Sequence, residues 1–327
     1  MKKDLKTDFR FASIITTYRC NAQCHMCNIW KFPTDQKEEL DVSIYEKLPN
    51  VHSFNVTGGE PFLRSELPDI IRILKKKSRR IVISSNGYFT DRIARLFKQH
   101  RDIGLRVSLE GLPRANDDLR GIKDGFDRGI RTLIELDRMG VKDIGFGITV
   151  SDRNAKDLLE LYHLSKMMKL EFASAALHNA FYFHKFDNKF DDPVAAKHEF
   201  KKLAEELLRS KRVKDWFRAF FNYGLAQYID GKPRPLPCEM GHDSFFLDPF
   251  GRILACNALD QSMGNLKGSS FDTIWSSPES EAVRAQVRAC QKNCWMIGSV
   301  SQQMKKYIWV PAGWIIKHKF LGRKICV

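Results

Sequence analysis

The chain has 327 residues, with 54 Lys and Arg against 39 Asp and Glu, which gives a formal net charge of +15. This length is sufficient for a large core and two domains, and the lack of any apolar run of about 18 residues excludes a membrane-spanning helix. The first residues, MKKDLKTDFRF, have no apolar stretch behind their charges, so we expect no signal peptide and a cytoplasmic protein. In that compartment the eight cysteines favour metal ligands or reactive thiols over disulfides.

Short apolar segments alternate with amphipathic segments over the first half of the chain. The predicted strands are 11–17, 53–58, 80–87, 105–111, 144–150 and 170–177, with helical patterns between them. Six β–α repeats predict parallel strands with right-handed crossovers, in an α/β fold that forms an open sheet or partial barrel. By analogy with complete barrels, active residues are expected at the carboxyl ends of these strands.

The pattern changes after about residue 185. Two helices are predicted at 195–211 and 213–230, and the proline-rich stretch GKPRPLP (231–237) predicts a rigid linker. Beyond it, HDSFFLDPFGRILACN predicts a β-hairpin around residues 248–251. We therefore expect a domain boundary within 185–237 and a small second domain after it.

Three cysteines lie close together just after the first predicted strand: Cys20, Cys24 and Cys27. A structural zinc ion usually has four protein ligands. A cubane iron–sulfur cluster needs one ligand per iron, so three cysteines would leave one iron open. An open iron can bind a substrate or a cofactor directly, whereas the alternative for these residues is a zinc knuckle.

The spacing Cys20-x3-Cys24-x2-Cys27 resembles the signature of radical S-adenosylmethionine (SAM) enzymes, although Met26 stands where that family usually has an aromatic residue. The segment GGEP at the end of the second predicted strand resembles the part of that family that cradles the SAM amino group; it comprises Gly58, Gly59, Glu60 and Pro61. Glycines allow the backbone to approach a ligand closely, and Glu60 could offset the ammonium charge. The resemblance implies a partial (β/α)6 TIM-like barrel and a [4Fe-4S] cluster whose open iron binds SAM.

Further SAM contacts are implied at the ends of the later strands. These candidates are Asn86, Ser108, Glu110, Arg120 and Val150. Each of them, taken alone, is equally explained as an ordinary strand-end or turn residue.

Four more cysteines flank the predicted hairpin and a following helical stretch: Cys238, Cys256, Cys290 and Cys294. Their setting resembles the C-terminal SPASM/twitch extension of radical SAM enzymes. Four ligands imply the shorter twitch version, a small α+β domain with one auxiliary [4Fe-4S] cluster, and a four-cysteine zinc site is the alternative. The resulting division is a radical SAM core (1–185), a helical linker region (186–237), a SPASM-like twitch domain (238–300) and a basic aromatic tail (301–327).

The resemblance implies a reaction. A reduced cluster gives an electron to SAM, and the resulting 5′-deoxyadenosyl radical abstracts hydrogen from a substrate, with flavodoxin or ferredoxin as electron donor. We expect a net oxidation (dehydrogenation) of a small polar, sugar-like or lipid-linked substrate, with the auxiliary cluster as electron acceptor. This oxidation also needs a base, for which position after the fifth and sixth strands recommends Asp152, Arg153, His178, Tyr182 and His184. Packing or surface roles are the alternative for each.

Two other functions compete with this interpretation. One is radical SAM modification of a ribosomal peptide or an RNA, and the other is a zinc-stabilised nucleic-acid-binding protein. The basic charge suits an anionic partner in general, and a well-solvated basic surface explains it equally well.

The last stretch, residues 304–327, contains six Lys or Arg and no acidic residue, interleaved with Trp309, Trp314 and Phe320. This composition suits the headgroup region of an anionic membrane or single-stranded nucleic acid. A terminal helix packed on the core is the alternative. We expect that the tail can dock the enzyme peripherally on an anionic membrane surface, and nucleic acid is the less favoured partner. Cys326 is expected to be a free thiol.

Overall fold

One mixed sheet organises the molecule. The computed structural model describes residues 5–327, and its sheet has nine strands in the order β6-β5-β4-β3-β2-β1-β7-β8-β9. The first six are parallel and follow chain order: β1 (Phe9–Ile15), β2 (Val51–Thr57), β3 (Ser78–Ser85), β4 (Gly104–Ser108), β5 (Ile144–Val150) and β6 (Glu171–Ala176). The sheet does not close, so the predicted α/β fold with an open, partial barrel is confirmed.

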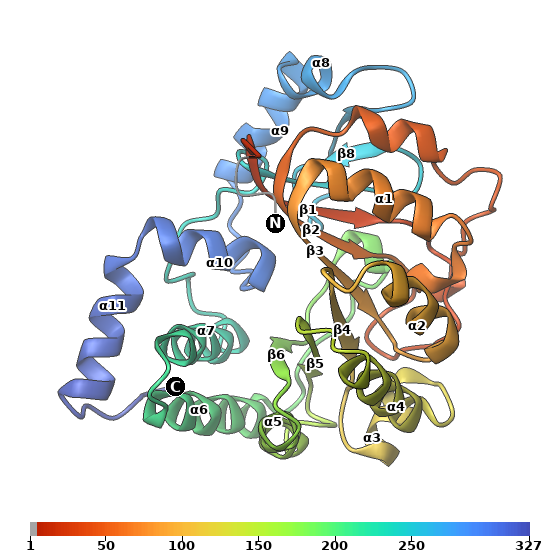
Figure 1. The fold of residues 1–327 in the computed structure, drawn as a ribbon. Coiled ribbons are helices and arrows are strands. Elements are labelled where there is room, and N and C mark those ends of the chain that lie inside the picture. Colours follow the sequence, from red (N-terminus) through yellow and green to blue (C-terminus); the bar gives the residue numbers. More distant parts are fainter. Residues whose placement is uncertain (1–4) are drawn as a thin grey trace.

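Helices cover the outer face of the parallel strands, as Figure 1 shows. They are α1 (Leu67–Lys77), α2 (Thr90–Gln99), α3 (Pro113–Arg120), α4 (Gly125–Arg138) and α5 (Asp157–Met167). Successive side chains of a strand point to opposite faces. In β2, Phe54 and Val56 are therefore buried in the core, whereas Ser53, Asn55 and Thr57 line the inside of the barrel.

Two long helices and a shorter one stand on the side that the sheet leaves open. α6 (Pro193–Arg209) and α7 (Val213–Ile229) lie within two residues of their predicted bounds, and α7 packs against β6. α10 (Ile297–Lys306) comes after the second cysteine set. Figure 1 shows α7 and α10 on the opposite side of the strands from α1 and α2, so these helices form the wall opposite the sheet.

The predicted hairpin is present, and it extends the sheet of the barrel. β7 (Ser244–Leu247) and β8 (Arg252–Leu254) are antiparallel, and β9 (Ser262–Asn265) continues them. β7 also pairs in parallel with β1. Because β7 occupies the free edge of β1, main-chain hydrogen bonds join the C-terminal module to the barrel in one continuous sheet.

The tight turn between β7 and β8 depends on two residues. Asp248 accepts hydrogen bonds from the amides of Phe250 (3.0 Å) and Arg252 (2.8 Å), and Gly251 has a φ of +90°, which favours glycine. After β9, the chain forms α8 (Phe271–Trp275) and α9 (Pro278–Arg288).

The last helical segments are α11 (Trp309–Ile315) and a π-helical turn, Ile316–Phe320. No helix within residues 5–327 combines the length and the apolar character that crossing a membrane requires.

Candidate functional site

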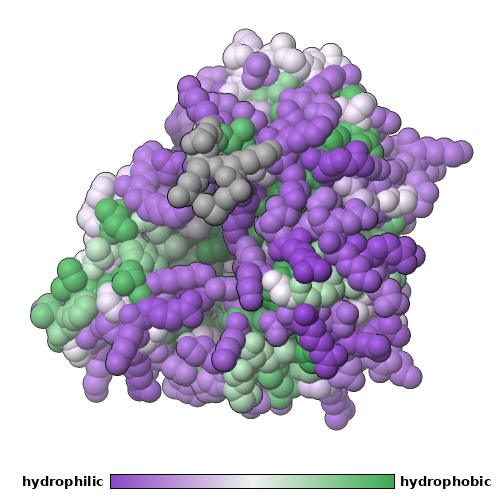
Figure 2. All heavy atoms as spheres, in the orientation of Figure 1, coloured by the Kyte–Doolittle hydropathy of each residue, from purple (hydrophilic) through white to green (hydrophobic). Residues whose placement is uncertain are grey.

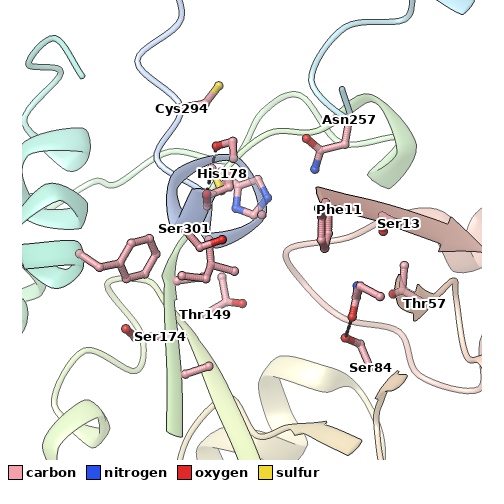
Figure 3. A pocket seen from close by; sticks show the side chains of 18 of the residues that line it. Phe11, Ser13, Thr57, Ser84, Thr149, Ser174, His178, Asn257, Cys294 and Ser301 are labelled. Atoms are coloured by element: carbon pink, nitrogen blue, oxygen red, sulfur yellow. Dashed lines mark hydrogen bonds between the residues drawn. The ribbon is translucent and has the colours of Figure 1, made fainter. Parts of the chain in front are cut away.

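A single cavity of about 2110 Å³ occupies the open barrel. Strands β1 to β6 line one side, and residues of α7 and α10 line the other. Figure 3 shows side chains from both walls around this space, among them Ser13 and Ser84 on one side and Cys294 and Ser301 beyond it. Both cysteine sets reach this cavity; the lining includes Cys20, Cys24, Cys27, Cys238, Cys256, Cys290 and Cys294.

The loop that carries the first three cysteines is held by its neighbours. The amides of Gln23 and His25 donate to the carbonyls of Arg120 and Leu119, both at 2.9 Å, at the end of α3. Asn21 accepts a hydrogen bond from the Asn86 side chain (2.8 Å), which follows β3. The loop is therefore held to the ends of two neighbouring elements, α3 and β3.

Gly58 and Gly59 line the cavity where β2 runs against the start of this loop. The Gly59 amide donates to the Thr17 carbonyl (2.7 Å), and the Glu60 amide donates to the Arg19 carbonyl (2.8 Å). A Cβ atom on Gly59 would lie 2.2 Å from the Arg19 carbonyl oxygen, a distance no side chain tolerates. The two glycines are thus required for the close approach of the two backbones.

Glu60 and Pro61 pack behind these glycines. Glu60 is fully buried and accepts hydrogen bonds from the Ser85 hydroxyl (2.9 Å) and from the amide of Asn86 (2.8 Å). Burial raises the pKa of this carboxyl, while the hydrogen bonds oppose the rise. Glu60 therefore ties the ends of β2 and β3 together.

A buried ion pair lies at the ends of β4 and α3. Arg120 donates to one oxygen of Glu110 (3.0 Å), and the amide of Thr149 donates to the other (2.5 Å). Burial raises the pKa of Glu110, and the charge of Arg120 opposes this effect. Ser108, Glu110 and Arg120 line the cavity, as does Thr149, whereas Val150 belongs to the buried core.

Two asparagines that the sequence analysis did not select support this pair. Asn154 is fully buried; its amide nitrogen donates to the carbonyls of Glu110 (2.7 Å) and Thr149 (3.0 Å). Asn116 accepts a hydrogen bond from the Glu110 amide (2.9 Å). Asn154 follows the fifth strand in the stretch SDRN, so its place after a strand end was the available signal.

The five residues considered as bases occupy different places. His178 and Tyr182 line the cavity, and His178 lies between the two walls in Figure 3. Asp152, Arg153 and His184 are outside the cavity lining. Asp152 accepts a hydrogen bond from the Asp191 amide, Arg153 contacts His25 at an exposed position, and the His184 ring stacks on Phe32.

The ring of His178 has a defined tautomer. Its Nδ1 lies 3.0 Å from the Ala176 carbonyl oxygen, which can only accept, so Nδ1 carries the hydrogen and Nε2 is left as an acceptor. Burial lowers the pKa of His178, which keeps the ring neutral near pH 7. Among the residues considered as bases, His178 therefore has the geometry of a proton acceptor.

Two side chains, Arg234 and Trp295, hold the loops of the second cysteine set through hydrogen bonds to main-chain carbonyls. Arg234 donates to the carbonyls of Cys294 (2.5 Å) and Leu236 (3.0 Å). Trp295 is buried and donates to the Phe221 carbonyl (2.8 Å). A Cβ atom on Gly224 would lie 2.2 Å from the Trp295 ring, so α7 needs glycine where this ring packs.

The thiols themselves fit iron–sulfur clusters. All eight cysteines are free, and burial raises the pKa of Cys20 and Cys27 to about 12 and that of Cys256 to about 11. Within residues 5–327, no three His, Cys, Asp or Glu side chains converge on a point that could hold a single metal ion. The donor set is one that iron–sulfur clusters use, with three free thiols in the first loop and four in the C-terminal part.

Two buried polar atoms beside the first set have no hydrogen-bond partner: Nε of Arg120 and Nδ2 of Asn21. Buried donors are nearly always paired, so these two suit an anionic or polar ligand in the cavity. A cluster-bound SAM with its carboxylate fits this requirement.

The comparisons with known proteins agree with these observations. The model of the radical SAM superfamily matches residues 14–165, and that of an iron–sulfur cluster-binding domain, SPASM, matches residues 238–295.

Three curated relatives each match about half of this chain. Fe-coproporphyrin III synthase of Methanosarcina barkeri is 31% identical over 163 residues, 47% of this chain and 40% of that protein. A probable GTP 3′,8-cyclase of Metallosphaera sedula is 28% identical over 166 residues, 48% and 52% of the two chains. Pre-heme d1 synthase of Dinoroseobacter shibae is 28% identical over 157 residues, 45% and 38% of the two chains. The chain thus spans about half or less of the length of these relatives.

Two solved structures share the fold over most of the chain. Native anSMEcpe with bound AdoMet has a TM-score of 0.62 at 13% identity and covers 94% of this chain and 99% of its own. Streptococcus suis SuiB bound to S-adenosylmethionine has a TM-score of 0.64 at 15% identity, with 90% and 75% covered. The chain therefore carries a radical SAM domain over residues 14–165 and a SPASM domain over residues 238–295, which imply a SAM-binding [4Fe-4S] cluster and an auxiliary cluster.

Proposed function

We propose that the enzyme oxidises a small polyhydroxylated substrate held between its two cluster sites. The observation that carries this proposal is that one cavity is lined by both cysteine sets and by uncharged polar side chains. In the proposal, Cys20, Cys24 and Cys27 hold the SAM-binding cluster, and Cys238, Cys256, Cys290 and Cys294 hold one auxiliary cluster.

The substrate class follows from the inner faces of the strands. The middle of the barrel carries hydroxyl and amide groups on neighbouring strands: Ser13, Asn55, Thr57, Ser84 and Ser108. Ser84 donates to Asn55 (3.0 Å), drawn as a dashed line in Figure 3, and leaves the Asn55 amide nitrogen available. Such a surface suits a neutral molecule with several hydroxyl groups, such as a sugar or a cyclitol.

When bound, SAM and its cluster supply one-electron chemistry that removes a hydrogen atom from an unactivated carbon. To become a carbonyl, the carbinol must then lose one proton and one electron. His178 accepts the proton at Nε2, because its Nδ1–H is held by the Ala176 carbonyl. In this proposal, the electron goes to the auxiliary cluster held by the four C-terminal thiols. A flavodoxin or ferredoxin is the proposed source of the first electron.

The chain's residues also protect this chemistry from water. Tyr182 packs with Tyr18 and Ile29 in an apolar cluster beside Cys20 and Cys27. This apolar wall covers one side of Cys20 and Cys27, which suits reactive one-electron intermediates.

The proposal is tested with reduced, cluster-reconstituted enzyme, SAM and polyols deuterated at their carbinol carbons. We expect deuterium in 5′-deoxyadenosine and a ketone that lacks a pair of hydrogens. The variant Asn55→Ser should raise KM for the polyol about 3- to 10-fold, and the exposed Ser65→Ala serves as control. If only peptides carrying the label transfer deuterium, the polyol proposal is wrong and peptide modification replaces it; anSMEcpe and SuiB have been solved with peptides bound.

A further inference from the structure

The cavity opens beside an exposed surface that is both apolar and basic. We call it the tail surface and define it by nine exposed side chains: Ile308, Trp309, Ile316, Phe320, Leu321, Lys305, Lys317, Arg323 and Lys324. The exposed fractions of its five apolar members are 45% for Ile308, 64% for Trp309, 52% for Ile316, 62% for Phe320 and 66% for Leu321. In Figure 2, hydrophobic side chains gather at the lower left, over α11.

This exposure is not the result of a loose chain end. The inner side of the same segment is packed: Ile315 is buried, and Trp314 contacts the rings of Tyr223 and Phe220 at 5.1 and 5.7 Å between centroids. Lys319 donates to the carbonyl of Ser210 (3.2 Å). The outer side chains are therefore held in solvent by a helix that is fixed to α7 and α6.

The π-helical turn extends the apolar row. The amide of Leu321 donates to the carbonyl of Ile316, five residues earlier, at 3.0 Å. In a π turn, residues five apart follow one another along the same side of the helix. Leu321 therefore continues the exposed row that Ile316 begins.

The charge of this surface has one sign. No Asp or Glu occurs after Glu281. Across residues 5–327, no acidic side chain pairs with Lys305, Lys317, Arg323 or Lys324. Exposed Trp, Phe and Leu side chains flanked by unpaired Lys and Arg are the pattern of a helix that lies in the interface of an anionic bilayer.

The rim of the cavity belongs to the same side of the molecule. Ile308 of the tail surface also lines the cavity, together with the exposed Val213 and Ile297 at the starts of α7 and α10. The exposed bases that line the cavity are Arg80, Lys142, Lys214 and Lys305; Arg80 pairs with Asp143 and Lys214 pairs with Glu171. Ile308 and Lys305 therefore connect the tail surface to the cavity.

From these contacts we infer that the tail surface docks the enzyme on an anionic membrane, with the cavity opening turned toward the lipid headgroups. Two copies of this surface cannot pair favourably, because each would oppose four unpaired cations with four. Nucleic-acid sites stack bases on aromatic rings along a basic groove, whereas three of the five exposed apolar side chains here are aliphatic. The inference does not depend on the substrate proposed above.

Co-sedimentation of the full-length, cluster-loaded protein with vesicles tests the docking. We expect binding to phosphatidylcholine vesicles that contain about one third phosphatidylglycerol, little binding to phosphatidylcholine alone, and release at high salt. The double variant Lys317→Glu/Lys324→Glu should bind at least about tenfold more weakly. The matched control Lys98→Glu/Lys123→Glu, at exposed positions on α2 and after α3, should bind as the parent does.

A second pair of variants tests the apolar contribution and the orientation. Trp309→Ser/Leu321→Ser should weaken binding about tenfold or more, while Met167→Ser, exposed on α5, should have no effect. Ile297→Ser at the cavity rim should also weaken binding if the opening faces the lipid. Brominated lipids should quench the fluorescence of Trp309, and Trp309→Phe should abolish that quenching.

Several outcomes would overturn the inference. Equal binding to neutral and anionic vesicles would exclude the role of the bases, and unchanged binding by the tail variants would exclude the surface. Tight binding to single-stranded RNA without vesicle binding, or self-association through this face, would identify a different partner. Unchanged binding by Ile297→Ser would exclude the orientation. Formation of 5′-deoxyadenosine with a soluble reductant should remain at the parent level in every tail variant, which separates this test from that of the proposed function.

Discussion

The two cysteine sets line the same cavity but are built differently. Around Cys20, Cys24 and Cys27 lie buried charged groups, Glu110 and Arg120, and two polar atoms without partners. The four C-terminal thiols are instead held by contacts to main-chain carbonyls and by an aromatic anchor. The difference is that unpartnered buried polar atoms, which suit an added ligand, lie beside the first set, whereas the second set is anchored through main-chain carbonyls.

The largest expected effect comes from removing one of the three N-terminal thiols. In Cys24→Ser, formation of 5′-deoxyadenosine should fall to background, because the open-iron cluster loses a ligand that nothing else in its loop can replace. Iron content should fall by about one cluster. The exposed Cys326→Ser is the control and should retain activity. Normal cleavage of SAM by Cys24→Ser would contradict the assignment of the first set.

Removal of a C-terminal thiol should separate the two halves of the reaction. Cys256→Ser should still form 5′-deoxyadenosine when substrate is present, but formation of the oxidised product should fall to background. The reason is that the substrate then lacks its electron acceptor. Product and 5′-deoxyadenosine are quantified in the same reaction, and full product formation would show that the second set does not accept the electron.

Within the buried pair of Glu110 and Arg120, a single substitution should lower the free energy of unfolding more than the double substitution does. Arg120→Met or Glu110→Gln alone leaves an uncompensated buried group and should cost about 3–5 kcal/mol of unfolding free energy. The double variant should recover part of this loss but should not bind SAM. Urea unfolding under anaerobic conditions measures the first effect, and strictly additive losses would argue against coupling of the two residues.

Substitution of Arg234, which lies beside the second cysteine set, should cost less unfolding free energy than substitution of Arg120 or Glu110. Arg234→Met removes hydrogen bonds to the carbonyls of Cys294 and Leu236, and we expect a loss of about 1–2 kcal/mol. Cleavage of SAM should be unchanged, because Arg234 contacts only the C-terminal loops. If Arg234→Met abolished SAM cleavage as Cys24→Ser does, the contrast between the two sets would be wrong.

Much of the fold could be predicted because it depends on local patterns. The fifth strand was predicted with the bounds of β5, and the hairpin around residues 248–251 was identified from its turn residues. Helix α3 was missed, because PRANDDLR has no apolar periodicity that would mark a helix. The pairing of β7 with β1 was also missed, because it joins residues that are far apart in the chain.

The residues of the candidate site also fall into two groups: those that a local pattern predicts and those whose place depends on the fold. Cysteine spacing and the GGEP segment are local signals, and they led to seven cysteines and two glycines that line one cavity, whereas Glu60 is buried behind the glycines. The direction of a side chain at a strand end is not a local property. Asp152 and His178 both follow strands, yet only His178 lines the cavity. The supporting role of Asn154 depends on its contact with Glu110, which follows β4, and the order of residues alone does not reveal that contact.

The pairing of β1 with β7 has a consequence for folding. Phe11 pairs with Ser244, so β1 gains its second neighbour only after a much later part of the chain has been synthesised. Until then it presents an open edge, which is a known starting point for misassembly. Contacts between such distant residues also slow folding, so the strand that leads into the first cysteine loop should be among the last parts of the sheet to be completed.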